Sequence, residues 1–476
     1  MFRFIRLLTG PTRISYSTLT TDNFEKTWVK PVSSSDIKRV SKNNDFPGVG
    51  VKKIAVIGAG VSGLCALKHL SQKPQTFQPT AFEKHHEVGG IWSYTERTTD
   101  EYGNQTHSGI YNNLMTNGPK QLMTIPGYPH DQSGNSYLHH TQILKYVQAF
   151  SNHYHLDQYV KLNTIINSIR PVPTEDNQVT WDVTYCNRYN VDETDTQRFD
   201  GVIVSTGHYS KCHIPHVEGR DKFKGSVIHS RDYRRPEVYK GQRVLILGAS
   251  FSGLDIAFDL STMAKQIYIG HRDSELSTKI PANVLERPDV NHLAEGNRVV
   301  FKDGSEAEID SIILCTGYSY HFPFLADDII QLKDERITPL YKHLVHIKYP
   351  NLLFVGLARC VSYFAQSYEQ ARAASIILEG GVRFPSEQEM MEDAEKDFQQ
   401  KRKEFDMTHL HAHYMGKGDL QWRMNKDHAE LCGFEVVPQV VKDMLEHVQM
   451  TRSGDFGNFR KKNYFYKDSK SFGVSN

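Results

Sequence analysis

Two glycine-rich segments have the residue types and the spacing that suit phosphate binding. The first, GAGVSG at 58–63, follows the apolar run IAVI and precedes a helical pattern. Its first glycine permits a tight turn, its second lets the backbone approach a diphosphate, and its third lets helix and strand pack closely. The helix N-terminus also offers N–H groups to phosphate. The candidate contacts of this predicted dinucleotide-binding loop are Gly58, Gly60, Val61, Ser62 and Gly63.

An acidic residue and a further glycine pair follow this loop. Glu83 ends the run TAF twenty residues after Gly63, the position from which a carboxylate hydrogen-bonds ribose hydroxyls. An acid there favours an unphosphorylated ribose, which means FAD or NAD in place of NADP. The segment EVGGIW at 87–92 has glycines that let the backbone pass a diphosphate, and a core aromatic is the other interpretation of its tryptophan. Its candidate contacts are Gly90, Ile91 and Trp92.

The second glycine-rich segment, GASFSG at 248–253, repeats the pattern after the strand-like run RVLIL. Serine replaces the middle glycine, which fits a cofactor that lies slightly further from the backbone. Nineteen residues after this segment, Arg272 follows the run QIYIGH, and an arginine there can pair with a 2′-phosphate. A solvated loop arginine is the alternative, but the position favours NADPH over NADH. The candidate contacts are Gly248, Ser250, Ser252, Gly253 and Arg272.

The elements that position these loops predict the fold class. Buried-strand runs at 51–57 and 243–248 precede the two loops, and apolar runs ending in Thr-Gly at 200–207 and 308–318 close the two units. We predict an α/β fold with two doubly wound, Rossmann-like domains, the NADPH domain inserted in the FAD domain. The expected boundaries are 1–50 for a lead-in, 51–212 for the FAD domain, 213–325 for the NADPH domain, and 326–476 for the return to the FAD domain with a helical C-terminal region.

Composition excludes several other classes of function. The 56 Lys+Arg and 55 Asp+Glu of the 476 residues nearly cancel, so no bulk charge favours nucleic acid or an anionic membrane. The six cysteines form no CxxC pair, which argues against a dithiol oxidoreductase. No apolar run has the length of a transmembrane segment. We expect no metal site, since the alternating histidines 409, 411 and 413 are more typical of an exposed loop.

The first 21 residues contain three arginines, many hydroxyl side chains and no acid. This pattern resembles a mitochondrial presequence, and a frayed basic tail is the alternative. The compartment therefore stays open between cytoplasm and mitochondrion, with peripheral membrane association not excluded. A homodimer is also left open.

Two further motifs resemble one enzyme family. The stretch from Phe223 to Tyr233 matches FxGxxxHxxxY, the pattern of flavin-containing monooxygenases, and Tyr111 to Lys120 is similar to their YxxLxTNxPK segment. The resemblance runs from about residue 51 to 380. The chain lacks the apolar C-terminal segment of membrane-bound animal members and is more similar to shorter members from insects, plants and fungi. Baeyer–Villiger monooxygenases share the fingerprint but end it in tryptophan where this chain has Tyr233.

The resemblance implies the chemistry and the cofactors FAD and NADPH. NADPH would reduce FAD, and reduced flavin with O₂ would give a C4a-hydroperoxide whose distal oxygen passes to a small-molecule amine or sulfide. Asn117 matches the family asparagine beside the flavin and is our candidate catalytic residue, while Thr116 is a candidate cofactor contact. His229 and Tyr233 we expect to be mainly structural. The alternatives are a Baeyer–Villiger oxygenase and an NAD(P)H-dependent flavoprotein reductase without oxygenation; the sequence does not identify the substrate.

Overall fold

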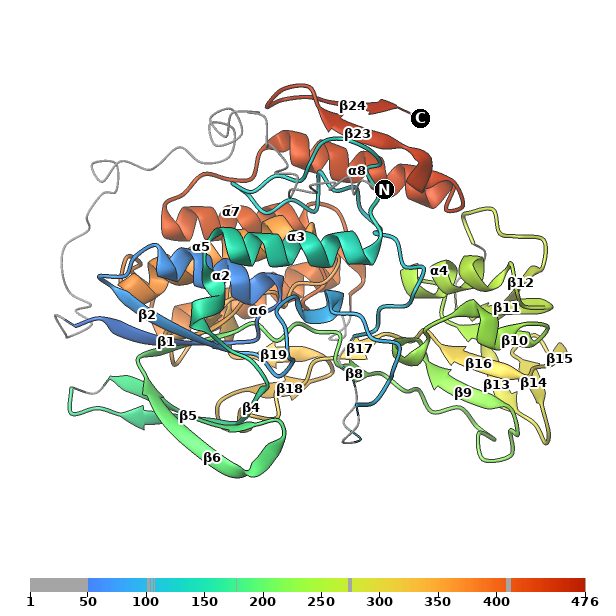
Figure 1. Ribbon diagram of the computed structural model, residues 1–476, viewed down its shortest axis with the longest axis horizontal. Helices are drawn as coiled ribbons and strands as arrows, with labels where there is room; N and C mark the ends of the chain where they lie inside the picture. Colours follow the sequence, from blue (N-terminus) through green and yellow to red (C-terminus); the bar gives the residue numbers. More distant parts are fainter. Residues whose placement is uncertain are drawn as a thin grey trace, which may run out of the picture.

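The computed structural model describes residues 50–100, 103, 106, 108–176, 178–272, 276–407 and 412–475. The expected lead-in segment, the presequence-like residues and histidines 409 and 411 lie outside these ranges. The fold is a mixed α/β arrangement, with two parallel sheets side by side and helices above them in Figure 1. No helix in the part of the chain that the structure covers is both long and apolar enough to cross a membrane.

Seven strands form the first sheet: β1 (Lys52–Ile57), β2 (Phe77–Phe82), β3 (Val160–Lys161), β7 (Gly201–Val204), β20 (Leu340–Tyr341), β21 (Val345–His346) and β22 (Leu352–Phe354). Their order is β20–β21–β22–β7–β1–β2–β3, and the strands from β22 to β3 run parallel. The strands predicted within 51–57 and 200–207 are confirmed. They are neighbours, so the first glycine loop and the first Thr-Gly segment leave the sheet at the same edge.

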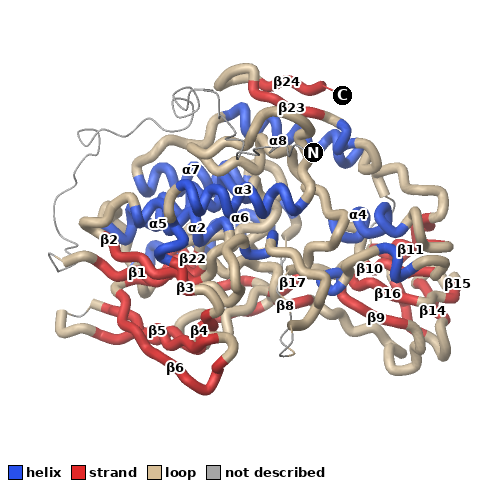
Figure 2. The backbone as a smooth tube through the Cα atoms, viewed as in Figure 1, coloured by secondary structure: helices blue, strands red, loops and turns tan. Residues whose placement is uncertain are grey.

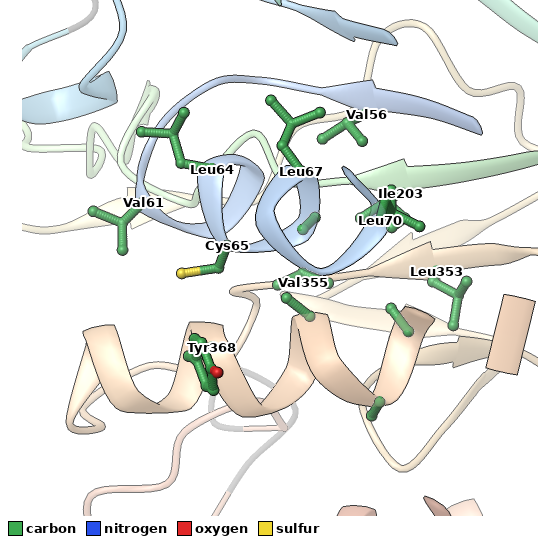
Figure 3. Packing of buried hydrophobic residues seen from close by; sticks show 14 of the residues in the cluster. Val56, Val61, Leu64, Cys65, Leu67, Leu70, Ile203, Leu353, Val355 and Tyr368 are labelled. Carbon is green, nitrogen blue, oxygen red and sulfur yellow. The ribbon is translucent and has the colours of Figure 1, made fainter. Parts of the chain in front are cut away.

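Two helices cover one face of this sheet. They are α2 (Val61–Ser71), which follows the first glycine loop, and α5 (Tyr363–Glu379). Figure 3 shows how their apolar side chains meet the strands: Leu67 of α2 lies near Val56 of β1, and Tyr368 of α5 faces Cys65. These residues are buried, so the first glycine loop is carried by a tightly packed core.

The second parallel sheet lies entirely between β7 and β22 in the sequence. Its strands are β9 (Ser226–His229), β10 (Arg243–Leu247), β11 (Gln266–His271), β12 (Val284–Pro288) and β16 (Ser311–Leu314), in the order β12–β11–β10–β16–β9. Helix α4 (Phe251–Leu260) follows β10 as α2 follows β1. The small antiparallel sheet β13 (Val290–Leu293), β14 (Arg298–Phe301) and β15 (Glu306–Glu308) connects to it. The strands predicted within 243–248 and 308–318 are confirmed.

An antiparallel sheet packs against the other side of the first sheet. It consists of β4 (Thr164–Pro173), β5 (Val179–Asn187) and β6 (Asn190–Phe199). Helix α3 (His140–His153) lies on the helical side of the molecule. Two-stranded pairs complete the strands before α5: β8 (Lys211–Cys212) with β17 (Tyr318–Ser319), and β18 (Gln331–Lys333) with β19 (Arg336–Thr338).

The C-terminal region is helical, as predicted, but its polar tail is packed onto the fold. Its elements are α6 (Glu387–Phe405), α7 (Leu420–Cys432), α8 (Gln439–Gly454), the short helix η6 (Phe459–Lys461), β23 (Asn463–Tyr466) and β24 (Phe472–Ser475). Figure 2 shows the β23–β24 hairpin beside α8, at the edge of the molecule opposite β6. Phe459 and Tyr464 are buried in a cluster with Leu122 and Tyr137. This tail therefore covers the segment that contains Asn117.

One buried acid in α5 gives a prediction for stability. Glu369 is 5% exposed, and its Oε2 atom has no hydrogen-bond partner among the described residues. Burial raises its pKa to about 7, against the opposing charge of Arg372. Because the folded-state pKa lies above the unfolded-state value, stability is greatest below the unfolded-state pKa and is lost as pH rises towards 7.

We therefore expect Glu369→Gln to stabilise the protein more at pH 8 than at pH 5, with a difference of about 2 kcal/mol in the free energy of unfolding. Urea denaturation at the two pH values measures this difference. The exposed Glu387 on α6 supplies the control variant Glu387→Gln, for which we expect no such difference. An equal effect of Glu369→Gln at both pH values would contradict the prediction.

Candidate active site

The first glycine loop has the backbone that its glycines were expected to provide. Gly58 has φ +102°, a backbone angle that residues with a side chain rarely adopt. A Cβ atom there would lie 2.8 Å from the carbonyl oxygen of Ser205. A Cβ atom at Gly63 would lie 1.9 Å from the carbonyl oxygen of Gly58. The turn and the close approach of helix to strand thus both exclude a side chain.

The second glycine pair lies directly against this loop. Gly89 donates its N–H to the carbonyl of Ala59 at 3.1 Å, and a Cβ atom at Gly90 would lie 3.0 Å from the Cα of Gly60. The two backbones therefore form one surface without side chains. Next to it, Ile91 accepts a hydrogen bond from Ser108 through its carbonyl, and the Trp92 ring packs edge-on against Phe364. Trp92 is half-buried, so it both packs against the core and borders the site.

The N-terminus of α2 presents backbone N–H groups beside this surface. The first helical hydrogen bond runs from Leu64 N–H to the Gly60 carbonyl, so the N–H groups of Val61, Ser62 and Gly63 have no acceptor within the helix. The Ser62 hydroxyl points the other way, towards α5, where it lies 2.9 Å from the hydroxyl oxygen of Ser367. Ser62 can therefore contact a phosphate only through its backbone.

Glu83 lies immediately beyond the end of β2 and under the first glycine loop. Its Oε2 accepts the N–H of Ala59 at 2.8 Å, and its Oε1 accepts the N–H of His85 at 2.9 Å. Burial raises the pKa of this carboxyl, while the two N–H donors oppose that change. Each carboxylate oxygen keeps a further lone pair, so Glu83 can still accept a hydrogen bond from a ribose hydroxyl.

The second glycine loop repeats the geometry of the first. Gly248 has φ +103°, and a Cβ atom at Gly253 would lie 1.8 Å from the Gly248 carbonyl oxygen. Ser250, which replaces the middle glycine, has φ −77° and ψ −170°, against −75° and −171° for Gly60. Its backbone is therefore unchanged by the substitution. The exposed Ser252 lies in the first turn of α4, where the helical N–H groups are again free of helical acceptors.

The strand register places Arg272 one residue beyond the position that Glu83 occupies in the first unit. Gly58 donates its N–H to the carbonyl of Phe82, and Gly248 donates to that of Gly270, so the equivalent of Glu83 is His271. His271 Nε2 lies 2.7 Å from Glu286 Oε1 and is buried. The Arg272 side chain is 86% exposed and lies 3.5 Å from Asp289. It can therefore turn towards a ligand without breaking a buried contact.

Asn117 is held by two arginines of the C-terminal region. Arg460 donates from Nη2 to Asn117 Oδ1 at 2.7 Å, and Arg452 donates to the Asn117 carbonyl at 3.2 Å. The neighbouring Thr116 is buried, and its hydroxyl accepts the N–H of Leu138 at 3.0 Å. The Thr116 side chain thus has a structural partner and keeps its hydroxyl proton and one lone pair for a ligand.

The segment that contains Asn117 also contacts α4 of the second unit. Tyr111 donates to Asp255 at 2.8 Å, and Asn113 donates to Asp259 at 2.8 Å. Tyr233, the last residue of the fingerprint, donates to the same Asp259 at 2.6 Å. Burial and the charge of Asp259 raise the pKa of Tyr233, so its hydroxyl stays protonated and donates. These contacts fit the structural role expected for Tyr233.

His229, the other fingerprint residue, also makes structural contacts. Its Nδ1 accepts the N–H of Arg231 at 3.1 Å, and its Nε2 lies 3.0 Å from the carbonyl oxygen of Gly317. Burial lowers its pKa, so the ring is neutral and Nε2 is the donor. His229 therefore fastens the linker to the second Thr-Gly segment.

Sequence reasoning missed the C-terminal residues near the second glycine loop. A small cavity there is lined by Ala249, Ser250 and Phe251 on one side and by Arg452 and Ser453 at the end of α8 on the other. The Arg452 guanidinium lies 4.0 Å from the centre of the Phe251 ring. Arg452 is visible in the sequence, but nothing in the sequence indicates that it faces the loop.

Buried amides near the first loop fit a bound cofactor. Gln366 on α5 is 2% exposed, and neither of its amide atoms has a partner in the part of the chain that the structure describes. Gln370, one turn further, accepts the N–H of Gly356, but its own Nε2 has no partner in these ranges. An unpaired buried amide costs about 1–3 kcal/mol, and a polar group of a bound ligand removes that cost.

Comparisons with known proteins agree with this geometry. The family model described as flavin-binding monooxygenase-like matches residues 51–279 and 272–419. Senecionine N-oxygenase of Tyria jacobaeae is 30% identical over 424 residues, which cover 87% of this chain and 89% of that protein. Trimethylamine monooxygenase of Pelagibacter ubique (strain HTCC1002) is 33% identical over 356 residues, covering 72% and 79%.

A solved structure extends the agreement to three dimensions. The S-allyl-L-cysteine S-oxygenase from Allium sativum has a TM-score of 0.78 and 27% identity, and the match covers 86% of this chain and 95% of that one. The family model alone matches well over half of the chain. The chain belongs to the flavin-binding monooxygenase-like family, whose enzymes depend on FAD and NADPH.

Proposed function

We propose that this chain uses NADPH and O₂ to place one oxygen atom on a soft nitrogen or sulfur atom of a small molecule. The named relatives support this class of substrate: one oxygenates senecionine at nitrogen, one acts on trimethylamine, and one oxygenates S-allyl-L-cysteine at sulfur.

Each glycine loop is proposed to bind one cofactor. Residues 51–212 and 326–476 would form a doubly wound FAD domain, and residues 213–325 an NADPH domain inserted in it. The parallel order of each sheet and the position of β9 to β16 between β7 and β22 support this division. The bare backbone surface at Gly60 and Gly90 would hold the FAD diphosphate, and Glu83 its ribose.

The second loop would hold the diphosphate of NADPH through the N-terminus of α4. Gly248 and Gly253 give the turn, Ser250 keeps the backbone of the middle glycine, and Ser252 can add a hydroxyl donor. Arg452 lies across the cavity from this loop and would supply a positive charge. Arg272 is proposed to pair with the 2′-phosphate that distinguishes NADPH from NADH.

Replacing Arg272 tests the choice of nicotinamide cofactor. We expect Arg272→Ala to raise the KM for NADPH by about 10- to 100-fold, as befits the loss of a charge-assisted hydrogen bond. The KM for NADH should stay within about twofold, because NADH lacks the phosphate. Steady-state kinetics with both cofactors give the answer, with the exposed Arg298, paired with Glu306, supplying the control Arg298→Ala. Equal effects on NADPH and NADH would assign Arg272 another role.

Asn117 is proposed to act where the two cofactors meet. The observation that carries this proposal is the position of the 111–117 segment, which is bonded to Asp255 and Asp259 of α4 on one side. On the other side, the same loop region reaches α5, where Ser362 donates to the carbonyl of Leu122. The amide N–H group of Asn117 can donate a hydrogen bond to the oxygen that is transferred and to the nicotinamide cofactor.

FAD, when bound and reduced by NADPH, supplies the two electrons with which one atom of O₂ becomes water and the other joins the substrate. The protein residues contribute binding, orientation and exclusion of water. No acid–base pair is required, since the nucleophile is the lone pair of the substrate nitrogen or sulfur.

Product analysis with three substrate types tests the proposal. The holoenzyme is incubated with NADPH and a tertiary amine, a thioether or a cyclic ketone, and the products are identified by mass spectrometry. We expect an N-oxide and a sulfoxide. A lactone from the ketone, without the other two products, would favour the Baeyer–Villiger alternative. NADPH oxidation without any oxygenated product would favour a reductase.

A further inference from the structure

Arg460 makes hydrogen bonds with three of its nitrogen atoms, and they connect three parts of the chain. Nη1 and Nη2 donate to the two carboxylate oxygens of Asp255 at 2.7 and 2.9 Å. Nη2 also donates to Asn117 Oδ1 at 2.7 Å, and Nε donates to the carbonyl of Thr116 at 3.0 Å. The guanidinium thus joins the C-terminal region, helix α4 and the loop that contains Asn117.

This arrangement decides which end of the Asn117 amide faces the guanidinium. Arginine has only donors, so the amide must turn its oxygen towards Arg460 and its Nδ2 away. Within the described ranges, Nδ2 of Asn117 makes no hydrogen bond. Nδ2 is not among the buried polar atoms that lack a partner. We propose that Arg460 is a positioning residue that fixes the Asn117 amide with its N–H donor directed to the cofactors. This inference rests on the proposed role of Asn117.

Arg460 lies in the C-terminal region, a part of the chain that the family motifs do not include. The family model ends at residue 419, whereas Arg460 lies in η6. The arginine is held in place because its neighbour Phe459 is buried against Tyr137, and the Arg460 guanidinium lies 4.6 Å from the Phe459 ring. Figure 1 shows the C-terminal region passing above α3 with the end of α8 near α4. The C-terminal region therefore holds the Arg460 guanidinium against the loop that contains Asn117.

We expect a change at Arg460 to lower coupling, which is the amount of oxygenated product formed per NADPH oxidised. We expect it to leave cofactor binding unchanged. Without Arg460 the amide can present either end, so a fraction of turnovers would lack the donor. We expect Arg460→Met to lower the oxygenated product formed per NADPH oxidised by at least about threefold, with hydrogen peroxide making up the difference. FAD content and the rate of flavin reduction by NADPH should stay within about twofold. Arg460→Lys keeps one donor nitrogen, so its coupling should lie between that of the wild type and that of Arg460→Met.

Two further variants separate positioning from a structural role. Asp255→Asn breaks the ion pair but keeps an oxygen that can accept the hydrogen bond of Tyr111, and it keeps the bond from Arg460 to Asn117. We therefore expect lower stability with unchanged coupling. The double variant Arg460→Met/Asp255→Asn leaves no unpaired buried charge and should fold even if Arg460→Met does not. It should show the same loss of coupling. Lys461→Met, at the exposed neighbour of Arg460, is the matched control.

The outcomes distinguish this inference from the proposed function. Full coupling in Arg460→Met, or in the neutral double variant, would overturn the positioning role. The same holds if Asn117→Ala and Arg460→Met lower coupling additively in combination, because a residue that acts through Asn117 has no effect once the amide is gone. If Asn117→Ala itself keeps full coupling, the role of Asn117 fails, and the positioning inference fails with it.

Discussion

Gly63→Ala will yield a protein that has lost FAD, whereas Gly253→Ala will keep FAD and lose its response to NADPH. A Cβ atom at either position would lie within 2 Å of a carbonyl oxygen of its own loop, 1.9 Å for Gly63 and 1.8 Å for Gly253. The helix must then move away from the strand, and the N–H groups that we propose to hold the diphosphate move with it. We expect at least about a 100-fold loss of affinity for the cofactor of the altered loop.

The flavin absorbance of the purified protein measures the first effect, and anaerobic reduction by NADPH measures the second. Gly454→Ala at the end of α8, where a Cβ atom meets nothing within 4 Å, is the matched control and should keep both cofactors. Thermal unfolding of all three variants separates cofactor loss from misfolding. If Gly253→Ala lost FAD while Gly63→Ala kept it, the assignment of the two loops would be reversed.

Asn117→Ala is the second change with a large expected effect. Removing a single preorganised donor to the reacting oxygen lowers turnover by about 100- to 1,000-fold in comparable sites, and we expect a loss of product formation in that range. NADPH oxidation should continue and yield hydrogen peroxide, because neither glycine loop is altered. Asn117→Asp keeps the oxygen that Arg460 binds but removes the N–H donor, so it should be as impaired as the alanine variant.

Asn113→Ala is the control for this series. Asn113 lies in the same loop and is exposed, and among the residues that the structure describes its side chain bonds to Asp259 and Asn112. We expect its product formation to stay within about twofold of the wild type. Separate assays of product, NADPH and peroxide are required. Unchanged product formation in Asn117→Ala would remove Asn117 from the catalytic role.

The backbone of the two glycine loops was predictable from the sequence because its requirements are local. Gly58 and Gly63 lie five residues apart, and both the positive φ of Gly58 and the close approach of Gly63 to the Gly58 carbonyl arise within this short segment. The same holds for Gly248 and Gly253. Strands that precede such loops are buried on both faces, so their apolar runs were also correctly placed.

The register of Arg272 and the role of the tail were not predictable in the same way. The hydrogen bond of Gly248 to Gly270 puts His271 in the position of Glu83, and a count of residues alone does not reveal this one-residue offset. Arg460 contacts Asn117 across 343 residues and Asp255 across 205. Such contacts depend on how the C-terminal region folds back, and a polar, basic composition contains no information about that path.

The most direct test of the central claim is the origin of the oxygen in the product. The holoenzyme is given NADPH, a tertiary amine and ¹⁸O₂, and the mass of the product is compared with the NADPH consumed. We expect one ¹⁸O atom in the N-oxide for each NADPH oxidised. NADPH consumption that gives only hydrogen peroxide, with no ¹⁸O in any amine or thioether product, would contradict oxygenation and identify the chain as a flavoprotein reductase.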